Sequence, residues 1–161
     1  MSSLPPTSLA STLLQAARVD AAVFAGRSLA DGLLAQIEPR ARPAVQDLVY
    51  GSLRAYGRGD FVLARLLSRP LPQDEVRALL LVTLYRLETQ SHAAHTVVDQ
   101  AVAAAGEIAG GAFRALVNAV LRNFLRQRER LLSDVGASSD EARYSYPQWW
   151  IDRLTRQYPA E

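Results

Sequence analysis

The stretch that most constrains the fold spans residues 112–132, with the sequence AFRALVNAVLRNFLRQRERLL. Its apolar side chains recur at steps of three and four residues, which places them on one side of an α-helix. The opposite side carries arginines at positions 114, 122, 126 and 130. We therefore expect a long helix around whose apolar side the other helices gather and whose arginine side can meet an acidic partner. The apolar residues are Phe113, Leu116, Val117, Val120, Leu121, Phe124 and Leu125.

Length and composition restrict the class of protein. At 161 residues the chain has the size of one domain, and no apolar run approaches the ~20 residues that span a membrane. Residues 1–11 contain no basic side chain and no long apolar stretch, so we expect no signal peptide and a cytoplasmic location. The absence of cysteine excludes disulfides, thiolate metal sites and cysteine nucleophiles.

All 18 basic side chains are arginine, since the sequence contains no lysine. The formal net charge of +2 does not itself predict a nucleic-acid partner, and a GC-rich genome would also favour arginine over lysine. Guanidinium groups nevertheless bind phosphate through paired hydrogen bonds and stack on bases. Clustered arginines are therefore more informative here than the net charge.

The pattern predicts an all-α fold, a bundle of about seven short-to-medium helices followed by a C-terminal helix. No segment alternates apolar and polar residues over a useful length. We expect Gly57 and Gly59 to break one helix and Asp60 to cap the next. The run 79–82 is apolar nearly all round, which predicts a central position. The predicted helices span residues 9–24, 29–37, 43–56, 61–67, 75–89, 95–107, 112–132 and 147–158.

The sequence contains no recognisable catalytic or metal-binding constellation. The carboxylate pairs at 74–75 and 140–141 are adjacent, and neighbours in a helix point about 100° apart, unlike a catalytic dyad. His92 and His95 are three residues apart, but no third or fourth metal ligand is evident. We therefore expect no catalytic residue, no cofactor and no metal in this chain.

The arginine side of the long helix is the strongest functional signal. Neighbouring arginines repel one another unless an anion lies between them, so the cluster favours RNA binding, although a solvated helix face explains any single arginine. Arg54 is a weaker member that would join the cluster if the helix beginning near Pro43 packs alongside, as would Arg40, Arg42 and Arg58. We expect Asn118 and His95 to have structural roles, Asn118 by tying the long helix to a neighbouring loop. The predicted RNA-binding residues are Arg114, Arg122, Arg126, Arg54 and Arg130.

Four segments occur together in an order that resembles a known family. They read LVYGSLR at 48–54, LLLVTLYRLE at 79–88, HTVVDQAV at 95–102 and LVNAVLRNFLR at 116–126. Together they resemble the NusB-like domain, in the version found at the N-terminus of RsmB-type (Fmu/Sun) ribosomal RNA cytosine-5 methyltransferases. The resemblance implies an all-α RNA-binding domain that helps dock small-subunit rRNA for a catalytic domain that uses S-adenosylmethionine.

The C-terminal segment refines this interpretation. Residues 144–161 resemble the segment that joins the NusB-like domain to the methyltransferase domain in RsmB. We therefore expect an RNA-binding domain at 8–135 and, at 136–161, a linker and the first helix leading to a methyltransferase domain outside this chain. Cytosine-5 methylation needs a thiolate nucleophile, so a chain without cysteine is not the catalytic part. S-adenosylmethionine is expected only in the parent enzyme.

Two alternatives remain open at the level of sequence. One is a free-standing NusB-type antitermination factor that binds leader RNA with a ribosomal or other transcription-complex protein. The other is a helical protein-interaction module that uses Trp149 and Trp150 as anchors. Neither alternative involves a membrane.

Overall fold

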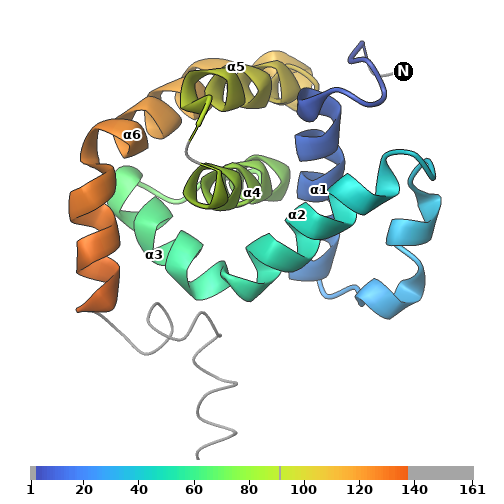
Figure 1. Ribbon diagram of the computed structural model, residues 1–161, viewed down its shortest axis with the longest axis horizontal. Coiled ribbons are helices and arrows are strands. Elements are labelled where there is room, and N and C mark those ends of the chain that lie inside the picture. The colour runs from blue at the N-terminus through green and yellow to red at the C-terminus, as the bar shows by residue number, and fades with distance from the viewer. Residues whose placement is uncertain (1–2, 91, 138–161) are drawn as a thin grey trace, which may run out of the picture.

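Helix α4 (Asp74–Thr89) forms the centre of the molecule. The structure, a computed structural model, describes residues 3–90 and 92–137. Figure 1 looks nearly along α4 and shows the other helices arranged around it. Residues 78–84 are all buried, as expected for a segment that is apolar on every side. The central position predicted for the run 79–82 is confirmed.

Helices α1 (Leu9–Phe24), α2 (Arg42–Arg54) and α5 (Ala94–Ala105) all pack against α4. The side chain of Ser8 accepts a hydrogen bond from the backbone N–H of Ser11, as expected for an N-cap. The predicted single helix at 29–37 is instead two short 3-10 helices, Leu29–Asp31 and Leu34–Gln36. Gly32 separates them with a φ of 80°, a conformation that ends a helix.

Helix α3 (Tyr56–Leu66) corrects the prediction for residues 57–60. Gly57 and Gly59 lie inside this helix and are buried. The boundary between α2 and α3 comes earlier, at Ala55. A Cβ added to Gly59 would lie 3.0 Å from Leu81 of α4, so the glycine permits close packing of the two helices. Asp60 is also inside α3, where its carboxylate accepts a hydrogen bond from Arg77 and caps nothing.

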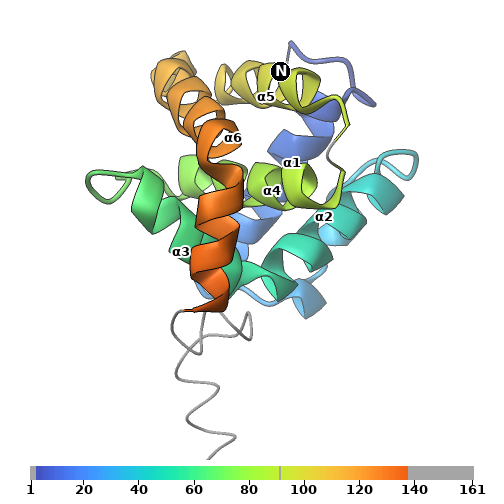
Figure 2. The same cartoon turned by 60° about the vertical axis from the view of Figure 1, so that its left-hand side comes forward.

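Helix α6 (Arg114–Gly136) is the long helix predicted from the sequence, but it lies at the periphery. Figures 1 and 2 show it along one side of the bundle, where it packs against α5, α3 and α4. Its buried side chains include Val117, Leu121 and Phe124. The expectation that the other helices gather around α6 is therefore wrong. A helix with arginines along its outer side cannot be surrounded. Helix α4 can be, because its segment 78–84 is buried on every side.

The described residues contain helices and no strand, which confirms the all-α class. A short 3-10 turn, Ala109–Gly111, leads into α6 through Gly110 and Gly111, both of which have positive φ. None of the described helices is both long and apolar enough to cross a membrane. The predicted helix at 147–158, with Trp149 and Trp150, lies outside the described residues, as does most of the predicted linker.

Candidate nucleic-acid interface

Helix α6 carries a row of polar side chains spaced four residues apart, at 114, 118, 122, 126 and 130. Arg114 and Arg126 are exposed, and neither guanidinium forms a hydrogen bond or ion pair with any described residue. Arg130 is also exposed and donates to the amide oxygen of Gln127 at 2.8 Å, a neutral partner that leaves its charge uncompensated. These three guanidinium groups are therefore available to an anion.

Arg122 differs from the other arginines of this row because it is held by its neighbours. Its Nε donates to Oδ1 of Asn118 at 2.9 Å, and one Nη lies 3.3 Å from Nδ1 of His95. Its other Nη forms an ion pair of 3.2 Å with Asp99. His95 and Asp99 belong to α5, so Arg122 links the two helices. Asn118 thus orients a side chain of its own helix rather than binding a loop.

Acidic side chains do little to neutralise α6. The helix has five arginines, including Arg128, against only Glu129 and Asp134. Asp134 lies 3.6 Å from Arg65 of α3, and Arg128 donates weakly, at 3.4 Å, to the backbone carbonyl of Glu88. The outer side of α6 is therefore positively charged. We call its five polar side chains the α6 row, namely Arg114, Asn118, Arg122, Arg126 and Arg130.

Arg54 lies on a different surface from the α6 row. Helix α2, which carries it, packs on α1 and α4, whereas α6 packs mainly on α5 and α3 (Figure 2). The condition under which Arg40, Arg42 and Arg58 would join the cluster is therefore not met. Arg58 instead forms a 2.7 Å ion pair with Glu88. The predicted arginines are thus divided between two separate surfaces.

Arg54 belongs to a second row, which the sequence analysis missed. Arg42, Gln46, Tyr50 and Arg54 are four residues apart on α2, and we call them the α2 row. Tyr50 is 41% exposed and is the one large hydrophobic side chain among the described residues to stand out in this way. The four-residue spacing was the available signal for this row.

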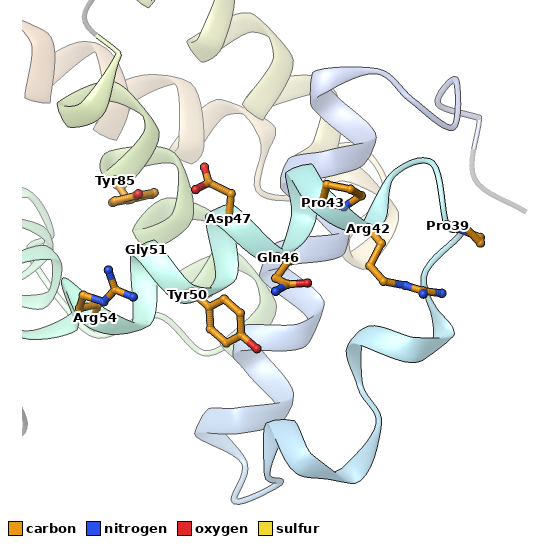
Figure 3. A pocket seen from close by; sticks show the side chains of 9 residues that line it. All are labelled: Pro39, Arg42, Pro43, Gln46, Asp47, Tyr50, Gly51, Arg54 and Tyr85. Carbon is orange, nitrogen blue, oxygen red and sulfur yellow. The ribbon is translucent and has the colours of Figure 1, made fainter.

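The α2 row borders a cleft between α2 and α4 (Figure 3). Tyr50 and Gln46 point to one side of α2, and Asp47 points to the other, toward Tyr85 of α4. The ring of Tyr85 lies directly against Gly51, where any Cβ would collide with it. A glycine at this position is therefore what allows the wall of the cleft to form.

Behind the α2 row, a buried carboxyl joins α2 to α1. Asp20 is fully buried, with Oδ2 at 2.5 Å from Oγ of Ser52, and Oγ is also 3.2 Å from the carbonyl of Val49. Burial raises the pKa of Asp20 to about 7, although the Ser52 hydrogen bond opposes the increase. Below that pKa, neutral Asp20 can donate to Ser52, which then donates to Val49.

Comparison with known proteins places these surfaces in context. A family model described as the NusB family matches residues 10–126. The Vibrio cholerae protein named ribosomal RNA small subunit methyltransferase B is 37% identical over 142 residues, or 84% of this chain and 32% of that protein. Proteins of the same name from Escherichia fergusonii and Escherichia coli O127:H6 are 32% identical over 153 residues, or 92% of this chain. The chain spans about a third of the length of these relatives.

Proposed function

This chain belongs to the NusB family, and from that membership we propose that it is a non-catalytic RNA-binding domain that docks small-subunit rRNA. The similar proteins named above are methyltransferases of that RNA. We propose that the parent protein likewise has a catalytic domain outside this chain, which methylates cytosine at carbon 5 with S-adenosylmethionine. The docking domain and that catalytic domain would then act on one RNA.

The observation that carries this proposal is the set of uncompensated guanidinium groups on α6. Arg114, Arg126 and Arg130 are exposed and have no carboxylate partner among the described residues. Phosphate oxygens suit such groups, because a guanidinium can form two parallel hydrogen bonds to them. Asp99 partly neutralises Arg122, so we propose that Arg122 contributes less than the other three to phosphate binding.

Charge reversal on α6 tests the proposal. We expect Arg126→Glu to weaken binding to fragments of small-subunit rRNA, and the double variant Arg114→Glu, Arg126→Glu to weaken it further. Each lost phosphate contact should also reduce the slope of log affinity against log salt concentration by about 0.7–0.9. Fluorescence anisotropy at several salt concentrations measures both quantities on the full chain.

Arg27→Glu supplies the matched control. Arg27 is exposed, lies beyond the end of α1, and its guanidinium forms no hydrogen bond or ion pair within the described part of the chain. The substitution makes the same change in net charge away from α6. Equal losses for Arg27→Glu and Arg126→Glu would show a general charge effect and refute an α6 interface. Failure of the unmodified chain to bind any rRNA fragment would refute the function itself.

A further inference from the structure

We propose that the α2 row binds an unpaired nucleotide of RNA, with the base stacked on Tyr50 and the backbone phosphate held by Arg54. This inference rests on the proposed RNA-binding function and adds a second site of a different kind. The row combines an exposed aromatic ring with positive charge one helical turn away. Aromatic side chains beside cations are what single-stranded nucleic acids bind, because every base has a face that can stack.

The exposure of Tyr50 is unusual for this molecule. The other large apolar side chains of the described residues are buried or packed against the core, whereas Tyr50 is 41% exposed on a well-formed helix. Its neighbours along the row, Gln46 and Arg54, are exposed as well. The ring therefore stands on a rigid element and can accept a flat partner with little loss of conformational freedom.

Positive charge is present at both ends of the row. Arg54 is exposed and has no acidic partner among the described residues. Arg42 donates to the backbone carbonyls of Ala35 and Ile37, at 3.3 and 2.9 Å. Because both partners are neutral, Arg42 retains its full charge in a fixed position. Steps of four residues rise about 6 Å along a helix, so the row is about 18 Å long, enough for more than one nucleotide.

The cleft contains one carboxylate, Asp47, and it points away from Tyr50 toward Tyr85 (Figure 3). Two guanidinium groups against one carboxylate leave the lining with a net positive charge. An acidic ligand is therefore favoured over a basic one. Gln46 points to the same side as Tyr50 and offers an amide that can both donate to and accept from a base edge.

Substitutions at Tyr50 separate base stacking from other roles. The probe is an oligouridine of about 12 nucleotides, within the roughly 4–16 nucleotides that one single-strand-binding fold covers. We expect Tyr50→Ala to reduce its affinity about 5- to 160-fold, because a stacked base is lost. Tyr50→Phe retains the ring and should bind as the unmodified chain does. Tyr50→Leu retains apolar bulk without a ring and should lose as much affinity as Tyr50→Ala.

Arg54→Gln gives a complementary result. It should lower the salt slope for the oligouridine by about 0.7, the value for one contact with a single strand, whereas Tyr50→Ala should leave the slope unchanged. A fully paired RNA duplex should bind equally well to the unmodified chain and to Tyr50→Ala. Photocrosslinking of 4-thiouridine-substituted oligouridine should label the peptide that contains Tyr50.

Several outcomes would overturn the inference. One is unchanged oligouridine affinity in Tyr50→Ala together with no crosslink at Tyr50. Full oligouridine affinity in Tyr50→Leu would likewise exclude stacking, because leucine retains apolar bulk but has no ring. If binding of rRNA fragments still depended on Arg126 in these cases, the proposed function would stand while the α2 site would not. Circular dichroism of each variant confirms that the helices are retained.

Discussion

Helices α2 and α6 present the same surface pattern but are anchored differently. Each carries polar side chains four residues apart along one line. The polar anchor of α2 is buried, through Ser52 and Asp20, and lies on the side away from the row. The anchor that α6 makes from its own row is Arg122, which reaches Asp99 of α5 at the surface.

The difference shows that position in a row does not determine what a side chain does. On α2, the buried anchor through Ser52 is separate from the row, and only Arg42 of the row is held by backbone carbonyls, so that Tyr50 and Arg54 remain available to a ligand. On α6, the row gives one of its arginines to helix packing and retains Arg114, Arg126 and Arg130. The two anchors should also respond to different solution conditions, the buried one to pH and the exposed one to salt.

The largest expected effect concerns the buried anchor of α2. The folded chain binds the proton of Asp20 more tightly than the unfolded chain, because its pKa is raised from 3.8 to about 7. The stability contributed by this proton is fully present below pH 3.8, is lost as the pH rises toward about 7, and changes no further above it. The difference amounts to on the order of 4 kcal/mol.

Asp20→Asn tests this prediction, because an amide does not titrate. Chemical denaturation across this pH range gives the free energy of unfolding of both proteins. As the pH rises, the free energy of unfolding of Asp20→Asn should increase steadily relative to that of the unmodified chain. Above pH 7 the variant should be the more stable protein. A difference that does not vary with pH would mean that Asp20 has the same pKa in the folded and unfolded chains, so that burial does not raise it.

A smaller effect is expected where α2 crosses α4. Gly51→Ala places a methyl group against the ring of Tyr85. Overpacking costs about 1–3 kcal/mol, and replacing glycine in a helix returns about 1 kcal/mol. We expect a net loss of about 1 kcal/mol in the free energy of unfolding, measured by denaturation with urea.

The double variant Gly51→Ala, Tyr85→Ala provides the control, since it removes the ring that the methyl group meets. Relative to Tyr85→Ala alone, the added Gly51→Ala substitution should then be neutral or stabilising. The same loss in both backgrounds would indicate that Gly51 is needed for a reason other than its contact with Tyr85.

The smallest expected effect concerns the exposed anchor of α6. Arg122→Gln breaks the ion pair with Asp99, whose side chain is 68% exposed, and exposed pairs contribute only about 0.5 kcal/mol. The loss of stability should diminish at high salt. Arg126→Gln should leave stability unchanged but lower the salt slope of rRNA binding.

The two substitutions on α6 therefore distinguish packing from RNA contact. If Arg122→Gln lowers the salt slope of rRNA binding as much as Arg126→Gln does, Arg122 leaves Asp99 when RNA binds. The α6 row would then act as a continuous set of contacts, as the sequence predicts, and its anchor would not differ from the rest of the row.

Local patterns predicted much of the fold. The spacing of apolar residues located the six α-helices of the described residues to within a few residues at most boundaries, and the run 79–82 identified the centre. The prediction at 57–60 was wrong because glycine has two uses. Glycine can end a helix, or it can allow two helices to approach closely, and Gly59 does the latter against Leu81. Only the packed structure distinguishes the two.

For the candidate site, the sequence identified the arginines of α6 but not which of them have a carboxylate partner. The α2 row escaped notice because Tyr50 resembles many half-buried tyrosines, and its exposure depends on how α2 lies on α1 and α4. Arg54 is exposed, and its predicted grouping with α6 required an arrangement of helices that the sequence does not show. Whether any of these residues contacts RNA is what the variants above test.

The amino-acid sequence by itself determined which segments are helical and that cysteine chemistry is absent from this chain. The tertiary structure decided which charges are free. Arg122 is compensated by Asp99, 23 residues earlier, and Asp20 depends on Ser52, 32 residues later. Helix formation follows from contacts within one or two turns, whereas the charge and exposure of a side chain depend on whatever distant element packs beside it.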